Sequence, residues 1–441
     1  MKDLTKGNPV KLILQFALPV LIGNVFQLFY NLVDTRIVGE TLGEDSLAAV
    51  GATNSVNTLI IGFLFGLTNG FAILVARNFG ANDRKELKRS VAGTLVLGVL
   101  TSVILTILSV IFLMPLLRVL NTPEEVIHKS YAYIRIIFLG MTAAMLYNIC
   151  ASVLRAIGDT VTPLIFLIIS TILNIYLDYF FILNLHAGVQ GAAYATVISQ
   201  MFSAVMCFLY IWKRYPMLHL RKEDFQIDRT LVKTMYKSGL SMGFMLSLVS
   251  LGTVILQSAI NTFGTKTIVA HTAARKITEI YMLIFSVFGT TMATYCGQNL
   301  GAGQVKRIRK GIKTVILLTW VWSIGVIIAS YTIAPQLVQL ITGTKDKEII
   351  HTASLYLRID TLFYFVPSMI TVLRNSMQGI GDHVTPIVSS MIELIGKFLV
   401  VLLLVPHLDY MGIIWSESIV WILMVIPLIV KIRSNPLLKE N

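Results

Sequence analysis

The chain has 441 residues, of which 55% are apolar and only 13% charged, and its formal net charge is +13. A water-soluble domain keeps about a quarter of its residues charged, so this composition excludes an ordinary soluble protein. The mean hydropathy of +0.76 indicates a chain that is largely surrounded by lipid.

Apolar runs of membrane-spanning length recur along the whole chain, and a helix needs about 20 such residues to cross a bilayer. We predict twelve spans, six in each half. In the first half they lie near 12–38, 47–75, 90–115, 129–154, 160–184 and 191–213. In the second half they lie near 233–262, 268–297, 312–335, 349–377, 384–406 and 411–432.

Lys and Arg gather in every second connection between these spans. The basic stretches lie at 2–11, 84–89, 213–237, 306–313 and 431–439. Connections rich in Lys and Arg stay on the cytoplasmic side, so we expect both termini in the cytoplasm and the chain in the cell (inner) membrane. The basic charge therefore sets topology, and we expect no nucleic-acid partner.

Two landmarks occur in both halves. Residues 77–81 (RNFGA) return at 298–302 (QNLGA), 221 positions later, and a basic run follows each copy. Residues 157–163 (IGDTVTP) return at 380–386 (IGDHVTP), 223 positions later. Two landmarks that agree on nearly one offset indicate an internal duplication. Each set of six spans enters the membrane in the same direction, so we expect the working site between or inside the halves.

The predicted fold class is therefore an all-α integral membrane protein, with twelve transmembrane helices in two pseudo-symmetric six-helix lobes. We expect an N-terminal lobe over 1–215 and a C-terminal lobe over 238–441. A basic cytoplasmic connection over 216–237 should join them.

The repeated Gly-Asp segments also have a local interpretation. In each copy the Gly permits a tight turn, the Asp caps the following helix, and the Pro suits its first turn. These residues are Gly158, Asp159 and Pro163 in the first half and Gly381, Asp382 and Pro386 in the second.

The first span carries a stripe of polar side chains, which are Asn24, Gln27, Asn31 and Asp34. Spacings of three and four residues place them on one face of a helix. A charged group at the centre of a bilayer costs about 2.5–3.5 kcal/mol on insertion scales. We therefore expect the stripe to face the bundle interior or a water-filled cavity.

Two later spans carry polar residues one turn apart, Asn174 and Asp178 on the fifth span and Thr196 and Gln200 on the sixth. With Asp34 they supply carboxylate, amide and hydroxyl oxygens, which suit a hard monovalent cation or a proton held by neighbouring carboxylates. Thr196 and Gln200 have an alternative role as hydrogen-bonding glue between helices. Asp34 and Asp178 indicate a functional role, because hydrogen bonding between helices does not require ionisable groups.

The ionisable residues of the second half follow another pattern. Lys397 stands where the first repeat has Asn174, and Glu393 lies one turn before it. Arg275 and Glu279 have the same spacing, so we expect both pairs to be neutralising ion pairs within the membrane. Two further acids without a partner at helical spacing are Asp360 and Glu417.

Two prolines that interrupt apolar spans are informative. Pro19 lies in the first span, fifteen residues before Asp34, and Pro367 lies in the tenth. Proline removes a helical hydrogen bond and permits a kink. A bend at Pro19 would link the occupancy of Asp34 to helix shape, and a static kink is the alternative. The cysteines lie in apolar spans without metal-ligand spacing and are expected to be packing residues, namely Cys150, Cys207 and Cys296.

These motifs resemble those of the multidrug and toxic compound extrusion (MATE) family, in its DinF-like prokaryotic branch. The segments that carry the resemblance are 33–39, 77–81, 154–160, 191–196 and 298–302. They occur in order at the matching spans, so the resemblance covers essentially the whole chain. Arg77 departs from the Gln that is usual at its position.

The resemblance implies two six-helix lobes and an antiporter that admits Na⁺ or H⁺ while expelling amphipathic, often cationic, drugs. The cation site implied by it consists of Asp34, Asn174, Asp178 and Thr196. Helix bending falls on Pro19 and cavity lining on Gln27, to which we add Asn31 and Gln200 from the same polar faces. Another branch has acids on helices seven and ten of the C-lobe. Here 239–262 holds no acid and Pro367 occupies the tenth-helix position, so we do not expect a C-lobe cation site of that type.

We therefore predict a cation-coupled (Na⁺ or H⁺) antiporter that exports small organic compounds by alternating access. We expect no enzymatic activity, no bound cofactor and a monomer. A flippase for a lipid-linked oligosaccharide or precursor is the alternative within transport, and it would need a cavity rich in Arg. A membrane enzyme would need clustered His, Asp or Ser, whereas the seven His are dispersed. A passive channel is less in keeping with two duplicated lobes.

Overall fold

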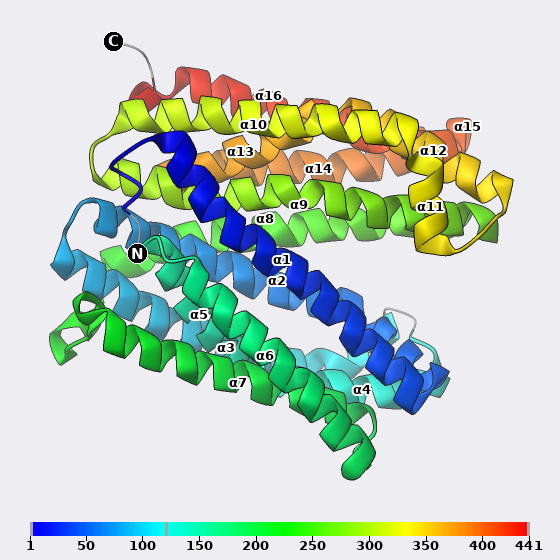
Figure 1. The fold of residues 1–441 in the computed structure, drawn as a ribbon, viewed down its shortest axis with the longest axis horizontal. Coiled ribbons are helices and arrows are strands. Elements are labelled where there is room, and N and C mark those ends of the chain that lie inside the picture. Colours follow the sequence, from blue (N-terminus) through cyan, green and yellow to red (C-terminus); the bar gives the residue numbers. More distant parts are fainter. Residues whose placement is uncertain (1–2, 120–121, 439–441) are drawn as a thin grey trace. The chain divides into compact units, whose positions relative to one another are not determined.

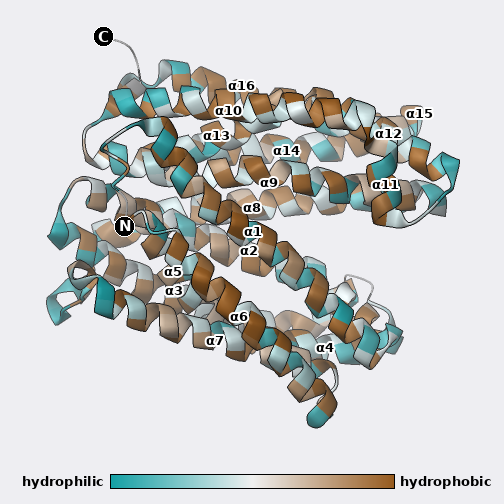
Figure 2. Ribbon diagram, in the orientation of Figure 1, coloured by the Kyte–Doolittle hydropathy of each residue, from teal (hydrophilic) through white to brown (hydrophobic). Residues whose placement is uncertain are grey.

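A computed structural model describes residues 3–119 and 122–438 of the chain (Figure 1), and within this part it contains helices and no strand. Hydrophobic residues dominate the long helices, and hydrophilic residues gather at the connections (Figure 2). Among the described residues, ten helices are long and apolar enough to cross a membrane. Two bent helix pairs bring the number to twelve if each pair is one span. The predicted all-α membrane fold is confirmed.

The helices follow the predicted spans in order. Those of the first half are α1 (Pro9–Leu42), α2 (Glu44–Gly80), α3 (Arg84–Val119), α4 (Glu124–Leu139), α5 (Met141–Ala156), α6 (Val161–Tyr179), the π-helical η1 (Phe180–Asn184) and α7 (Val189–Arg214). Two short 3-10 helices follow, η2 (Pro216–Leu218) and η3 (Lys222–Phe225). Those of the second half are α8 (Arg229–Ile260), α9 (Thr265–Gly301), α10 (Val305–Thr332), α11 (Ala334–Thr342), α12 (Lys347–Leu362), α13 (Phe365–Ile380), α14 (Val384–Leu403), α15 (Val405–Leu408), α16 (Tyr410–Ser434) and η4 (Pro436–Leu438). The second part of the connection predicted over 216–237 is thus helical from Arg229.

Each half contains one bent span at the corresponding position. The pair α4 and α5 bends by 45°, and the pair α12 and α13 bends by 55°. Gly140 stands at the first break, where a Cβ atom would collide with Val197 of α7. At the second break, Pro367 cannot donate an N–H to the carbonyl of Phe363, so the helix is interrupted there as the proline predicted. In contrast, α1 continues through Pro19 as a single helix.

The Gly-Asp segments adopt the predicted turns. Gly158 and Gly381 have φ angles of +81° and +91°, which glycine adopts without strain. Asp159 Oδ1 accepts the N–H of Thr162 at 3.0 Å, and Asp382 Oδ1 accepts the N–H of Thr385 at 3.1 Å. Both aspartates therefore cap the helix that follows. The three cysteines are buried and free, as expected.

The chain forms two compact units whose boundaries differ from those of the predicted lobes. Unit 1 contains Leu18–Gly243, whereas unit 2 contains Leu4–Ala17 and the chain from Phe244 onward. The first helix of each half therefore begins in the unit of the other half. Hydropathy identifies a spanning helix but not the helices on which it packs, so the sequence placed the boundaries at 215 and 238.

Closely packed glycines explain why the start of α8 belongs to unit 1. A Cβ atom on Gly70 of α2 would lie 2.5 Å from the Cα of Gly239, and one on Gly66 would lie 2.7 Å from the Cα of Gly243. Ser238 Oγ donates a hydrogen bond to the Gly70 carbonyl at 2.7 Å. Small residues one turn apart on both helices allow this close approach of backbones inside a membrane.

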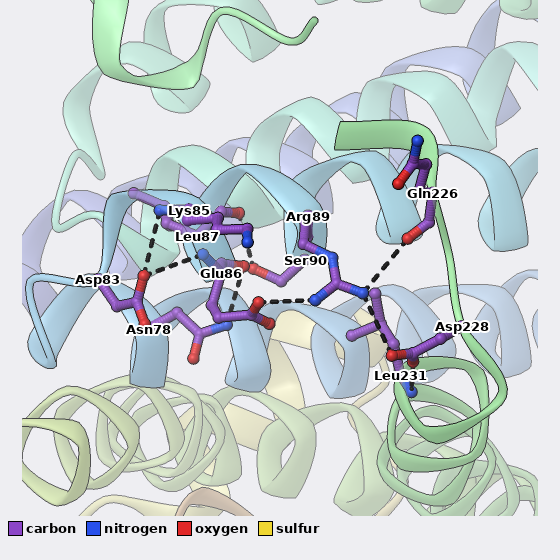
Figure 3. Close-up of polar contacts among 10 residues, drawn as sticks. All are labelled: Asn78, Asp83, Lys85, Glu86, Leu87, Arg89, Ser90, Gln226, Asp228 and Leu231. Atoms are coloured by element: carbon purple, nitrogen blue, oxygen red, sulfur yellow. Dashed lines mark hydrogen bonds and ion pairs between the residues drawn. The ribbon is translucent and has the colours of Figure 1, made fainter. Parts of the chain in front are cut away.

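Arg89, at the start of α3, fastens the chain that leads into α8 (Figure 3). Its guanidinium donates to the Gln226 carbonyl at 3.3 Å and to Asp228 Oδ2 at 3.2 Å. It also contacts Glu86 Oε1 at 2.7 Å. Asp228 Oδ1 in turn accepts the N–H of Leu231 at 2.7 Å. We call these contacts the Arg89 clasp.

Arg307, at the start of α10, does the same for the chain that leads into α1. Its guanidinium donates to the carbonyls of Gly7 at 2.8 Å and Leu4 at 3.0 Å. Gln298 Oε1 accepts the N–H of Leu4 at 2.9 Å. These contacts form the Arg307 clasp. In each half, an arginine that follows the repeated motif thus holds the chain just before the first helix of the other half.

Candidate functional site

Three helices of unit 1 bring together the four residues predicted to hold a cation. Asp34 comes from α1, Asn174 and Asp178 come from α6, and Thr196 comes from α7. Asn174 is 1% exposed and Asp178 is completely buried, while Asp34 and Thr196 are half-buried. The i, i+4 spacing on α6 turns both of its polar groups to one side of that helix.

The two carboxyl groups are the centre of this arrangement. The side chains of Asp34 and Asp178 lie within hydrogen-bonding reach of each other. One oxygen of each, Oδ1, is buried and has no hydrogen-bond partner among the described residues. Two buried carboxylates at this separation repel each other, so the pair requires a proton or a cation between or beside them.

Asn174 joins the carboxyl pair to α7. In the amide orientation that satisfies both of its neighbours, its Nδ2 donates to Asp178 Oδ2 at 3.1 Å. Its oxygen then accepts the backbone N–H of Thr196 at 3.1 Å. The amide therefore positions the Asp178 carboxyl relative to α7.

Two tyrosines near the carboxyl pair were missed by the sequence analysis. The hydroxyl of Tyr30 lies 3.4 Å from Thr196 Oγ1. Tyr30 and Tyr133 both lie close enough to Asp34 and Asp178 to interact electrostatically with them. Tyr30 precedes Asp34 by four residues, so helical spacing could have revealed it. Tyr133 on α4 has no such signal, because a buried aromatic residue is usually part of the core.

The other predicted residues lie outside this cluster. Gln27 and Asn31 are exposed on α1, and Gln200 is half-buried on α7. Pro19 lies on α1, fifteen residues before Asp34. The described contacts do not join any of these four residues to the carboxyl pair. The chemistry of the cluster is therefore that of two carboxyls, one amide and three hydroxyls. In the described part of the chain, no three His, Cys, Asp or Glu side chains come together as a metal site would require.

Unit 2 arranges its buried charges as an alternating row, which we call the charge chain. The row runs Arg374, Glu393, Lys397, Glu417, Arg275. Lys397 Nζ lies 3.0 Å from Glu393 Oε1 and 3.4 Å from Glu417 Oε1. Arg374 lies 3.5 Å from Glu393 Oε2 at one end, and Arg275 lies 3.4 Å from Glu417 Oε1 at the other.

The charge chain confirms one predicted ion pair and corrects another. Glu393 and Lys397 pair as their spacing predicted. The pairing of Arg275 with Glu279 is wrong, because Arg275 turns to the buried Glu417 while the exposed Glu279 lies near Lys276. A buried carboxylate gains far more from a counter-charge than an exposed one does. Glu417 thus has partners that come from other helices. Asp360 is 1% exposed, and its Oδ1 has no hydrogen-bond partner among the described residues.

Comparison with known proteins shows that one family model matches both halves of the chain. The family model MatE matches residues 19–180 and 241–403. The probable multidrug resistance protein YoeA of Bacillus subtilis is 29% identical over 408 residues, which cover 90% of this chain and 88% of that protein. The probable multidrug resistance protein NorM of Thermotoga maritima is 25% identical over 400 residues, which cover 87% and 83%.

Solved structures share the fold over nearly the full length. One is the outward-facing conformation of a multidrug resistance MATE family transporter of the MOP superfamily, with a TM-score of 0.88 at 25% identity. The match covers 97% of this chain and 96% of that chain. A crystal structure of a MATE protein in complex with MaL6 also has a TM-score of 0.88, at 24% identity, and covers 97% of both chains.

Proposed function

The chain belongs to the MatE family of multi-pass membrane transporters, and from that premise we propose that it exports small amphipathic, often cationic, organic compounds in exchange for Na⁺ or H⁺. The names of its relatives, which are multidrug resistance proteins, support the export of such compounds. The basic connections, two of which carry the clasps, support a topology with these connections in the cytoplasm.

The carboxyl pair of Asp34 and Asp178 is the observation that carries the proposed coupling. Two unit charges about 4 Å apart repel by roughly 4 kcal/mol at an effective dielectric constant of about 20. A proton or Na⁺ that enters the pair removes this repulsion, and it also supplies the unpartnered Oδ1 atoms with a partner. The pair therefore has a strong affinity for a small cation, which a transporter can exchange between the two sides.

The course of α1 suggests how cation binding at Asp34 affects the binding of the substrate. The helix starts in unit 2, where the Arg307 clasp holds the chain before it, and carries Asp34 in unit 1. Pro19 lies just after the point where α1 passes from one unit to the other. A change of charge at Asp34 is then expected to alter the bend at Pro19. In an exchanger, cation and substrate weaken each other's binding by the same factor.

The test is export of a lipophilic cationic dye from proteoliposomes under separately imposed Na⁺ and pH gradients. Wild-type protein should respond to at least one gradient, and Asp34→Asn should abolish that response. The control is Glu40→Gln, which makes the same change of charge at an exposed site on the same helix. Normal gradient-driven export by the correctly inserted Asp34→Asn variant would sink the proposed coupling.

A further inference from the structure

The connection between α7 and α8, within unit 1, carries five exposed basic side chains. None of the five forms an ion pair with another of the described residues. A topology signal needs only the number of bases in a connection, so their surroundings decide whether they also bind a ligand. We call these residues the basic surface, which consists of Lys213, Arg214, Arg221, Lys222 and Arg229.

The acids of the same connection do not neutralise the basic surface. Asp224 is buried and accepts the backbone N–H of Arg221 at 2.6 Å. Asp228 belongs to the Arg89 clasp, where it pairs with a base of α3 (Figure 3). Glu223 remains exposed and forms no ion pair among the described residues. Five bases therefore face one available acid, and the surface keeps a positive charge that an external anion can neutralise.

The connection is folded against the rest of unit 1. Its short helix η2 packs on α3 and α7, and η3 packs on α3. Tyr215, just before η2, is buried and donates a hydrogen bond to Asp159 Oδ2 at 2.7 Å. Arg89 donates to the carbonyl of Gln226, just after η3, at 3.3 Å. The bases therefore lie on a fixed scaffold, so a ligand does not have to order the chain when it binds.

Two exposed aromatic side chains indicate that the basic surface lies where lipid meets water. Trp212, on the last turn of α7, is 52% exposed, and Phe225, at the end of η3, is 43% exposed. The Trp212 ring stacks on His219, with ring centroids 4.5 Å apart. Exposed tryptophan is typical of the headgroup level of a membrane. α8 has 32 residues and begins with Arg229, so at about 48 Å it extends beyond a hydrocarbon core of about 30 Å.

We infer that the basic surface binds the phosphate groups of anionic phospholipids in the membrane leaflet beside it. Each Lys or Arg near an anionic membrane strengthens binding roughly fivefold. A zwitterionic lipid gains little, because the positive end of its headgroup cancels the charge of its phosphate. The aromatic pair Trp212 and Phe225 suits the boundary just below the phosphates.

This inference concerns the lipid around the protein and not the exported compound, so it goes beyond the proposed exchange. The connection that carries the basic surface leads through the Arg89 clasp into α8. Anionic lipid bound there should therefore hold this part of the chain more firmly, which amide exchange can detect.

The experiment compares bilayers of phosphatidylcholine with bilayers of equal parts phosphatidylcholine and phosphatidylglycerol. The full-length protein is reconstituted in both, and amide exchange over 213–229 is followed by mass spectrometry. Phosphatidylglycerol should slow exchange in this segment by roughly fivefold or more. High salt should reduce the difference, because it screens exposed charges.

Two triple variants with the same change of net charge locate the effect. The first is Arg214→Gln/Arg221→Gln/Lys222→Gln, in which phosphatidylglycerol should no longer slow exchange over 213–229. The matched control is Lys306→Gln/Lys310→Gln/Lys313→Gln on α10 of unit 2, whose side chains are also exposed, and it should keep the slowing. A lower pH close to the anionic bilayer acts on both variants alike, so their difference reports the bases of the basic surface.

Several outcomes would overturn the inference. One is equal exchange over 213–229 of the wild-type protein in the two bilayers, a comparison that needs no variant to fold. Another is equal slowing by phosphatidylglycerol in the two triple variants. Inorganic phosphate added to the protein in detergent should not reproduce the slowing, and if it does, the surface binds a soluble anion instead of lipid. Slowing by soluble polyglutamate but not by phosphatidylglycerol would point to an acidic protein partner instead.

Discussion

The same family model matches both halves of the chain, yet the two units bury charge in opposite ways. On α6 of unit 1, three residues one turn apart are Ser170, Asn174 and Asp178. At the repeat offset of 223 positions, α14 of unit 2 carries Glu393, Lys397 and Val401. The same helix face therefore presents one acid beside an amide in unit 1, and an acid beside a base in unit 2.

Asp34 and Asp178 of unit 1 have no basic partner among the described residues, whereas the buried Glu393 and Glu417 of unit 2 form ion pairs with bases. In unit 1 the Asp178 carboxyl interacts with another carboxyl, that of Asp34. In unit 2 Glu393 lies between two bases and Glu417 between two others. One helix face can thus change from the proposed site of a mobile cation to a fixed internal ion pair through three substitutions. Unit 1 is the place to look for coupling, and unit 2 is the place to look for rigidity.

The largest predicted effect tests this contrast through stability. Glu393→Gln leaves the buried Arg374 and Lys397 without their shared acid, and removal of one partner from a buried ion pair costs about 3–5 kcal/mol. Asp178→Asn removes a repulsion instead, so it should leave stability equal or higher while gradient-driven export is lost. Unfolding of the two purified variants, followed by circular dichroism, measures the stability of each. Equal destabilisation by the two substitutions would mean that the units do not differ in this way.

A second prediction concerns the start of α8, which belongs to unit 1. Gly70→Leu places a side chain where the α8 backbone lies 2.5 Å from a Cβ position. Overpacking of a tight core costs about 1–3 kcal/mol or more, and here backbone rather than a flexible side chain must move. We expect a marked loss of correctly folded protein in size-exclusion chromatography.

The matched control for this substitution is Gly62→Leu on the same helix, where a Cβ atom meets nothing within 4 Å. Gly62→Leu should give a near-normal yield of folded protein. Similar yields from the two variants would show that the close contact of α2 with α8 does not hold the start of α8 in unit 1.

Much of this fold could be predicted because lipid imposes simple rules on the sequence. Long apolar runs predicted the spans, and the repeat predicted that both halves share one plan. Proline chemistry predicted the bend before Pro367. The sequence also grouped Asp34, Asn174, Asp178 and Thr196, whose side chains do come together, and their role in coupling stays a prediction.

The contacts between distant helices could not be predicted in the same way. Spacing along one helix suggested Glu279 as the partner of Arg275, whereas the actual partner is Glu417, 142 residues away. The crossing of α1 and α8 between units was missed for a related reason, since hydropathy reports exposure to lipid and not the identity of a packing neighbour. Tyr133 was missed because its polar neighbours, Asp34 and Asp178, lie on other helices and cannot be read from its own helix.

A third prediction compares the two clasps, which have the same task in different units. Arg307→Ala removes the hydrogen bonds to Leu4 and Gly7, so amide exchange just before α1 should rise by roughly three- to tenfold. Arg89→Ala removes the bonds to Gln226 and Asp228, so exchange should rise just before α8 instead. Hydrogen exchange with mass spectrometry resolves both segments. Each variant is the control for the other, and a rise at both segments in either variant would contradict independent clasps.

The smallest predicted effect is the dependence of the Arg89 clasp on pH. The Leu231 N–H, and then the Arg89 guanidinium, hold the pKa of Asp228 below its ordinary value. A carboxyl whose pKa is lowered by folding contributes stability above its ordinary pKa of about 4, and this contribution is lost as the pH falls through the lower value of the folded state. Amide protection at Leu231, corrected for the intrinsic effect of pH on exchange, should therefore decline below about pH 4. In Asp228→Asn the amide group cannot titrate, so protection at Leu231 should be lower at neutral pH and should not decline in that range. A decline of the same size in this variant would mean that Asp228 is not the titrating group that ties the start of α8 to Arg89.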